Sequence, residues 1–190
     1  MKVAIAEGKD VTLASDIVLT SQLTINRSLT LDLAGHTISN TSSIWNDTDS
    51  IDAWSLVSVQ GSGVEVTITG GGSLSALKDD CYAVDVRDGA TVNLENGTYV
   101  GNIIAVYAID GGTANIKGGT YNIQQLSEFS DYRYHLNLRD NSESSIVVTG
   151  GTFHNYDPAN SNGENPVANL VAAGYSSAAQ DGNYVVTKNN

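Results

Sequence analysis

The sequence predicts an all-β chain: a single-stranded parallel β-helix, or solenoid, of about six coils with a short N-terminal helical cap. A repeated Gly-Thr-aromatic unit, alternating apolar pairs in each copy and a composition rich in turn and strand formers lead to this prediction. Only 16% of the residues are charged, and the chain has 19 glycines and 2 prolines. Gly, Asn, Ser and Thr suit turns and strands better than helices.

The repeated unit reads "ENGTYVGN" at residues 95–102, "KGGTYNIQ" at 117–124 and "TGGTFHNY" at 149–156. Equivalent glycines at positions 97, 119 and 151 are 22 and 32 residues apart. A period in the twenties with three short strands per unit is typical of a parallel β-helix coil. Each glycine is expected at a corner with a positive φ, and Tyr99, Tyr121 and Phe153 are expected to stack.

Apolar residues alternate with polar ones and keep the same register from copy to copy, which indicates strands with one buried face. Stacked one rung apart, about 4.8 Å, these residues would form a continuous core inside the coil. One ladder contains Val66 and Ile68, Val92 and Leu94, Ala114 and Ile116, and Ile146 and Val148; the other contains Val57 and Val59, Val84 and Val86, Val106 and Ala108, and Leu136 and Leu138.

Three regions follow from the limits of this pattern. Residues 1–10 are an N-terminal cap, in which a short helix closed by Gly8 covers the open apolar end. Residues 11–156 are the parallel β-helix, with loop insertions at 41–54 and 126–135. Residues 157–190 are a C-terminal loop and capping strands, where the period breaks and the chain is expected to fold over the other end.

The composition excludes several kinds of partner and site. With 21 Asp and Glu against 9 Lys and Arg, the net charge is -12, which would repel nucleic acid and anionic membrane surfaces. No apolar run reaches the roughly 18 residues that span a bilayer, and the first ten residues do not resemble a signal peptide. Cys81 is the only cysteine, so an internal disulfide or a zinc site with several thiolates is excluded.

The loop insertions carry the candidate binding residues. Because insertions in the same phase of a solenoid emerge at one corner, they are expected to cluster along one edge. Aromatic rings that stack on sugar faces, beside carboxylates that accept hydroxyl protons, suit a carbohydrate site. The alternative is that the tryptophans cover the coil edge or fill a subunit interface. The candidates are Trp45, Asp47, Asp49, Asp52 and Trp54 in the first loop, and Phe129, Asp131, Tyr132, Arg133 and Tyr134 in the second.

No residue pattern indicates catalysis or a cofactor. The segment "NDTDSID" at 46–52 lacks the glycine and spacing of a calcium loop, so calcium is only weakly indicated. His36, His135 and His154 are not in metal-ligand or triad spacing. Acids before Gly or Asn, at positions 88, 110 and 140, are expected to bond their own turn backbone. For a sugar-cleaving enzyme, the first residues to mutate would be Asp79, Asp80, Asp85 and Arg87.

The stretch "VTLASDIVLTSQLTINRSLTLDLAGHTISN" at 11–40 resembles the opening coils of the pectate-lyase-like right-handed β-helix superfamily, in which a "DL-x-G-x-TI" segment often closes an early rung. The "GGTF" unit and the ending "NLVAAGYSSAAQDGNYVVTK" at 169–188 are similar to surface and phage fibre-like proteins of gut bacteria and their viruses. The resemblance implies a right-handed coil and, for phage fibres, a homotrimer. The Asp clusters and the Asp/Arg arrangement of the family's enzymes have no match here.

The predicted function is therefore a non-enzymatic structural and host-recognition module: a bacteriophage fibre or head-decoration protein that presents loops to a host surface or glycan. Its expected partners are copies of itself or other virion proteins, and its expected location is the virion. One alternative is a secreted or cell-surface adhesin or carbohydrate-binding domain of a gut bacterium, located outside the cell. The other is a polysaccharide lyase or hydrolase.

Overall fold

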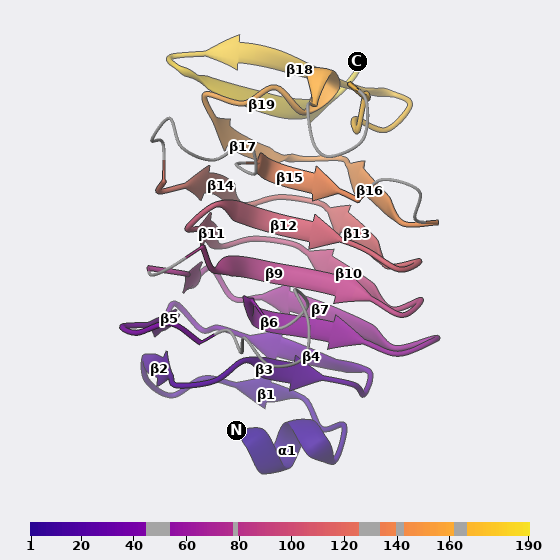
Figure 1. Cartoon of the computed structure of the whole chain (residues 1–190). Coiled ribbons are helices and arrows are strands. Elements are labelled where there is room, and N and C mark those ends of the chain that lie inside the picture. Colours follow the sequence, from indigo (N-terminus) through magenta and orange to yellow (C-terminus); the bar gives the residue numbers. More distant parts are fainter. Residues whose placement is uncertain (45–53, 78–79, 126–133, 140–142, 162–166) are drawn as a thin grey trace.

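The computed structural model describes residues 1–44, 54–77, 80–125, 134–139, 143–161 and 167–190. Its strands stack along one axis and form three sheets. Nearly all neighbouring strands within a sheet are parallel (Figure 1). Along most of the chain, successive strands enter the three sheets in one repeating order. This arrangement confirms an all-β chain with parallel sheets and is compatible with a β-helix-like solenoid.

The strands are short, and most have three to six residues. Sheet A contains β1 (Val11–Thr12), β4 (Leu29–Asp32), β7 (Glu65–Thr69), β10 (Thr91–Leu94), β13 (Thr113–Ile116) and β16 (Ser145–Val148). Sheet B contains β2 (Ile17–Leu19), β5 (Thr37–Asn40), β8 (Ser73–Ser75), β11 (Thr98–Gly101), β14 (Thr120–Ile123), β17 (Gly151–His154), β19 (Asn183–Lys188) and β18 (Tyr175–Gln180). Sheet C contains β3 (Leu23–Ile25), β6 (Ser55–Gln60), β9 (Tyr82–Arg87), β12 (Ile104–Ala108) and β15 (Tyr134–Leu138).

Both predicted apolar ladders are confirmed. In sheet A, Val92 is registered with Val66 on one side and with Ala114 on the other. In sheet C, Val84 is registered with Val57 and Val106. These side chains belong to one continuous buried cluster that runs through the solenoid. No single rung could bury its apolar face alone, so stacking supplies the core.

The aromatic ladder is confirmed as well, and it lies inside the core. The rings of Tyr99 and Tyr121 stack with centroids 5.0 Å apart, and those of Tyr121 and Phe153 with centroids 4.9 Å apart. All three side chains are fully buried. The hydroxyl of Tyr121 donates a 2.8 Å hydrogen bond to the Gly118 carbonyl, so its polar end is satisfied within the corner.

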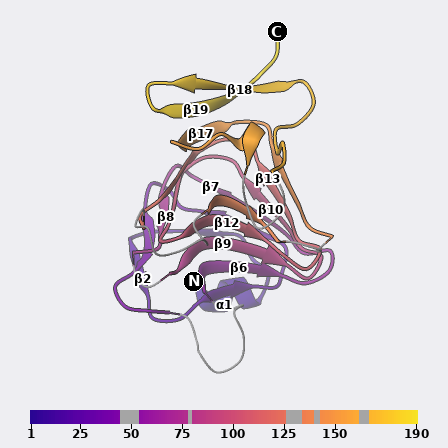
Figure 2. The same cartoon turned by 45° about the horizontal axis from the view of Figure 1, so that its top comes forward.

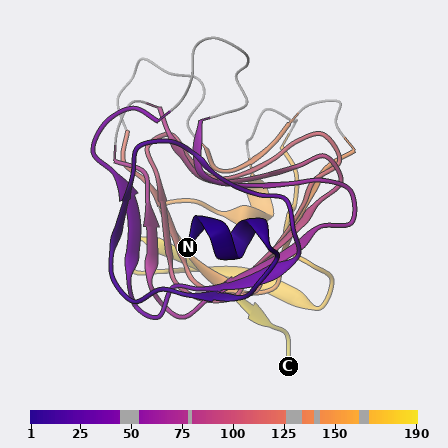
Figure 3. The same ribbon diagram turned by 90° about the horizontal axis from the view of Figure 1, so that it is seen from below.

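The two ends of the solenoid differ. At the N-terminal end, helix α1 (Lys2–Ala6) lies across the opening and buries Ile5, and Gly8 follows with φ +68° (Figure 3). At the other end, a 3-10 helix η1 (Pro158–Asn160) precedes the antiparallel hairpin of β18 and β19. Strand β19 pairs antiparallel with β17, which ends the parallel stacking (Figure 2). No helix in the described ranges has the length and hydropathy to span a bilayer.

The alternation of inward and outward side chains is broken at one position along the strands of sheet C. Ala83 and Val84 are consecutive, and both belong to the central core. Register nevertheless pairs Tyr82 with Ile104 and Val84 with Val106. Since two successive side chains point inward, both Tyr82 and Asp85 are left on the outer face of the sheet. The same break occurs in β6 and β12, so it runs along the solenoid and shapes the outer surface of sheet C.

Candidate functional site

The outer face of sheet C carries three rows of side chains across β6, β9, β12 and β15. The rows follow from strand register, which places equivalent residues one strand spacing apart, about 4.8 Å. The first row begins with a serine and continues with aromatic and aliphatic residues, the second is polar, and the third contains two arginines. In order they are Ser55, Tyr82, Ile104 and Tyr134; Ser58, Asp85, Tyr107 and Asn137; and Gln60, Arg87, Ile109 and Arg139.

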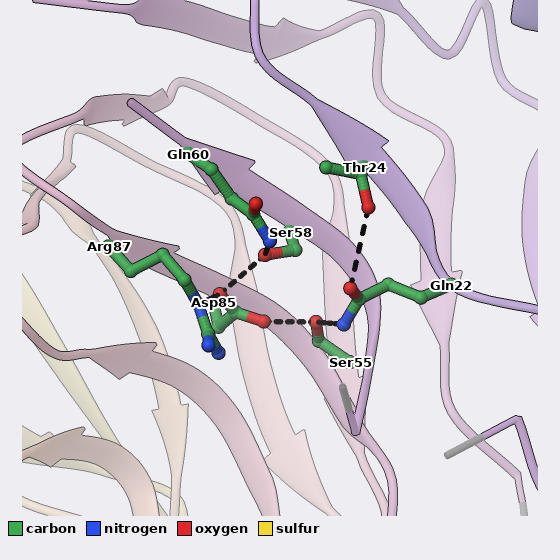
Figure 4. A network of polar contacts seen from close by, with 7 residues as sticks. All are labelled: Gln22, Thr24, Ser55, Ser58, Gln60, Asp85 and Arg87. Carbon is green, nitrogen blue, oxygen red and sulfur yellow. Dashed lines mark hydrogen bonds and ion pairs between the residues drawn. The ribbon is translucent and has the colours of Figure 1, made fainter. Parts of the chain in front are cut away.

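Asp85 is the centre of a polar network on this face (Figure 4). Its Oδ1 accepts a hydrogen bond from Ser58 Oγ at 2.7 Å and one from Arg87 Nε at 2.8 Å. Its Oδ2 accepts a hydrogen bond from Ser55 Oγ. Three donors from two adjacent strands therefore converge on one carboxyl group, and one of them belongs to an ion pair.

Two glutamine amides orient the hydroxyls of this network. Gln22 Nε2 donates to Ser55 Oγ at 2.9 Å, and Gln60 Nε2 donates to Ser58 Oγ at 2.9 Å. Each serine accepts from an amide and donates to the carboxyl group, so the direction of every bond is defined (Figure 4). Thr24 Oγ1 extends the chain of bonds by donating to Gln22 Oε1 at 3.5 Å. The network thus spans strands β3, β6 and β9.

The burial of Asp85 limits the chemistry that is open to its carboxyl group. Asp85 has no exposed area, and Arg87 is 6% exposed. Burial raises the pKa of the Asp85 carboxyl above its ordinary value of 3.8, and the Arg87 guanidinium opposes that rise. Because both oxygens already accept hydrogen bonds and neither reaches solvent, Asp85 is suited to fix Arg87 and the two serine hydroxyls in place rather than to exchange a proton with a ligand.

An aromatic cluster lies beside the polar network, outside the central core. Tyr82 packs against Trp54 with ring centroids 5.9 Å apart, and against Tyr107 at 5.4 Å in an edge-to-face arrangement. Ile104 fills the space next to Tyr82, and Tyr134 packs on the same cluster. Tyr82 and Tyr107 are buried, whereas Trp54 and Tyr134 are only half-buried. The cluster therefore presents aromatic surface at the two ends of the first row.

A groove of about 300 Å³ adjoins the network at its N-terminal end. It lies between α1 and β3, and Gln22 and Thr24 of the network form part of its wall. Asn26 adds a further amide, while Ile5 and Leu23 supply apolar surface. The groove thus combines apolar walls with amide and hydroxyl groups and the Lys2 side chain.

The structure places two of the sequence-predicted site residues and brings them together. Trp54 and Tyr134 come from different loop insertions, 80 residues apart in sequence, yet both pack on the same outer cluster of sheet C. The remaining candidates lie outside the described residues, and so does the expected clustering of the insertions along one edge. These candidates are Trp45, Asp47, Asp49, Asp52, Phe129, Asp131, Tyr132 and Arg133.

Of the four residues selected for the enzyme alternative, Asp85 and Arg87 form the buried ion pair. Asp80 instead lies in a turn with φ +58° before β9, and its N–H donates to Asn102 Oδ1. Asp79 lies outside the described residues. Asp88 and Asp110 lie in turns with φ of +56° and +50°, which confirms their turn position, while the expected bonding to their own backbone stays a prediction; the third acid, at position 140, is not described.

Sequence reasoning missed the serines, the glutamines, and Tyr82 and Tyr107. Aligning the outward positions between the core valines would have placed Ser58, Asp85 and Tyr107 in one row. The alignment alone would not have placed Ser55 and Tyr82, because strict alternation assigns them to the core. Within the described ranges, no three His, Cys, Asp or Glu side chains gather closely enough to hold a metal ion. The segment considered for calcium, 46–52, is not among them.

Comparison of the chain with protein-family models finds no match, and comparison with curated proteins and with solved structures finds none either.

Proposed function

We propose that the protein is a non-enzymatic recognition module that binds a glycan along the outer face of sheet C. The observation that carries this proposal is the half-buried pair Trp54 and Tyr134, which lie at two ends of one aromatic cluster beside a hydroxyl and amide network. Aromatic rings stack on the apolar faces of sugars, while amides and hydroxyls bond to sugar hydroxyl groups. Here the groups of the network that reach solvent are the half-buried Gln22 and Gln60 and the exposed Thr24, whereas Ser55 and Ser58 are buried.

The spacing of the row favours an extended ligand. Ser55, which follows Trp54, is registered with Tyr82, and the row then continues through Ile104 to Tyr134. Three strand spacings amount to about 14 Å, which exceeds the width of one sugar ring. An oligosaccharide that lies along the solenoid axis would contact both ends of the row. The groove beside α1 would extend its path beyond β3.

We propose that the fold is a right-handed parallel β-helix of about six coils, similar to that of the pectate-lyase-like superfamily. The "DL-x-G-x-TI" segment at 32–38 and the ending at 169–188 support that assignment by resemblance. We place the protein on a virion, as a bacteriophage fibre or head-decoration protein, where a coil without charged runs would serve as a stiff support. A cell-surface adhesin of a gut bacterium is the second context, and it would use the same face.

Cleavage of a polysaccharide is not the activity that this geometry favours. A glycoside hydrolase needs two carboxyl groups that flank the scissile bond, and a catalytic acid must reach the proton it transfers. Asp85 is buried with both oxygens engaged. We therefore expect no release of reducing ends or unsaturated products from polysaccharides. Cleavage by the wild type that is lost in an Asp85→Asn variant shown by its melting curve to be folded would establish the enzyme instead.

A glycan array tests the proposed function. Wild-type protein should bind a restricted set of oligosaccharides, and Trp54→Ala and Tyr134→Ala should each lower that binding at least tenfold. The matched control is Val147→Ala, which removes an exposed apolar side chain from sheet A and should leave binding unchanged. Melting curves establish that all variants are folded. Absence of binding by the wild type, or equal binding by all variants, would contradict the proposal.

A further inference from the structure

Among the described residues, the hairpin at the C-terminal end leaves one long strand edge unpaired. Sheet B ends at β18, which has six residues and no described strand on its outer side; it is the uppermost strand in Figure 1. At the opposite end of the solenoid the terminal strands β1, β2 and β3 have two or three residues each, and α1 packs beside β3. Short strands and covering helices are the usual protection of sheet edges. Strand β18 has six residues, and the described helix that contacts it, η1, has only three.

The hydrogen-bond register identifies the groups on this edge. Asn155 N–H donates to the Gly182 carbonyl, so Gly182, Tyr184 and Val186 direct their backbone groups towards β17. Residues 183, 185 and 187 then pair with residues 180, 178 and 176 of β18. Asn189 N–H donates to the Gly174 carbonyl, which continues the same alternation of bonded residues. The N–H and C=O groups of Ser177 and Ala179 therefore point away from the sheet.

The side chains of β18 would not oppose a second strand. The sequence of the strand is YSSAAQ, which contains no charge and no proline in a chain of net charge -12. Ala178, Ala179 and Gln180 are exposed. The tight turn at Asp181 and Gly182, with φ of +48° and +76°, matches the twist of the hairpin. An uncharged edge lets two copies of an acidic protein approach where most of the surface would repel.

We propose that β18 is a strand-addition site for a second copy of this chain, in an antiparallel, two-fold dimer. Ser177 of one copy would exchange both backbone hydrogen bonds with Ala179 of the other, and symmetry repeats the exchange. The two Ala178 side chains would face each other across the axis. Sheet B would then continue from one molecule into the next. A two-fold pairing closes with two copies, in contrast to the trimer expected from resemblance.

Sedimentation equilibrium over a wide concentration range tests the dimer. The wild type should show a mass that rises from 19.9 kDa towards twice that value. Ala178→Lys places like charges across the axis and should lower the association constant at least tenfold. Ala179→Pro removes an edge N–H without breaking the hairpin and should do the same. The matched control is Thr187→Lys, an exposed position on β19 that keeps the edge intact and should still dimerise.

Hydrogen exchange provides a second readout that does not depend on the variants. The amides of Ser177 and Ala179 should become protected as concentration rises, whereas they should exchange freely at high dilution. A wild type that stays monomeric with fast exchange at both amides overturns the proposal. So does a trimer, or a dimer that survives both Ala178→Lys and Ala179→Pro, because each result would locate the contact elsewhere.

Discussion

Gly119 meets two separate requirements at the corner of its rung. Its φ is +92°, and a Cβ atom there would lie 2.8 Å from the Gly97 carbonyl oxygen and 3.1 Å from the Tyr99 ring. The repeated glycine therefore provides the backbone conformation and also the space into which the aromatic ladder packs. Sequence reasoning predicted the first requirement from turn chemistry; the second depends on the neighbouring rung and could not be read from one copy.

Gly119→Ala should accordingly destabilise the protein by about 3 kcal/mol, since it adds a backbone clash to the strain of a positive φ. Gly35→Ala is the matched control: its φ is +80°, and nothing lies within 4 Å of the added atom, so it should cost about 1 kcal/mol. Urea unfolding of both variants measures the difference. Equal losses would show that the close contacts with the Gly97 carbonyl and the Tyr99 ring add nothing to the cost.

His135 gives the stability of the protein a dependence on pH. Its ring stacks on Tyr156 at 4.8 Å, and burial lowers its pKa from 6.5 to about 4. The unfolded chain therefore takes up the proton first, so stability should be level above pH 6.5 and fall by about 3 kcal/mol between pH 6.5 and pH 4. Asp85 acts with the opposite sign, because its raised pKa favours the folded state as pH falls.

Comparison of the wild type with His135→Phe isolates this effect, because the Asp85 contribution is common to both proteins. The variant keeps an aromatic ring against Tyr156 and should lose the fall in stability below pH 6.5. Urea midpoints at pH 7 and pH 4.5 provide the measurement. Parallel pH profiles for the two proteins would rule out His135 as the source.

At the scale of strands, the sequence predicted the inward residues well and the outward ones poorly. Register between Val66, Val92 and Ala114 follows from alternation, because one buried face tolerates no slip. The break in alternation at Ala83 and Val84 cannot be predicted in this way, since two consecutive inward apolar residues look the same in sequence as a shift of register. The candidate site depends on that break. The sequence predicted Trp54 and Tyr134, but their shared cluster depends on rung stacking.

Strand β9 contains the buried Asp85 and Arg87 pair, and Asp85 also links β9 to β6 by accepting hydrogen bonds from Ser55 and Ser58. Asp85→Asn leaves a buried guanidinium without its carboxylate and should cost about 3 kcal/mol; Arg87→Gln should cost a similar amount. The double variant should lose less than the sum, with a coupling of about 1–3 kcal/mol measured by urea unfolding. Strict additivity would mean that the pair does not act as a unit.

At the scale of the whole molecule, the solenoid should tolerate removal of a complete rung. Residues 90–111 span 22 positions, and their deletion joins Gly89 to Gly112, which forms the same Asp-Gly-Gly-Thr turn as residues 110–113. Because each rung contacts only its neighbours, the shortened chain should keep a strand-rich spectrum and one cooperative urea transition. Deletion of residues 90–100 removes part of a rung and should not fold. Equal behaviour of the two deletions would contradict a rung-by-rung core.

Binding of an oligosaccharide to the outer face of sheet C is proposed to depend on Trp54 and Tyr134. The most direct measurement is the dissociation constant of the best array glycan for the wild type, Trp54→Ala, Tyr134→Ala and Val147→Ala, by isothermal titration. We expect at least tenfold weaker binding for the two sheet C variants and an unchanged constant for Val147→Ala. Unchanged constants for Trp54→Ala and Tyr134→Ala, or an array without any bound glycan, would contradict it.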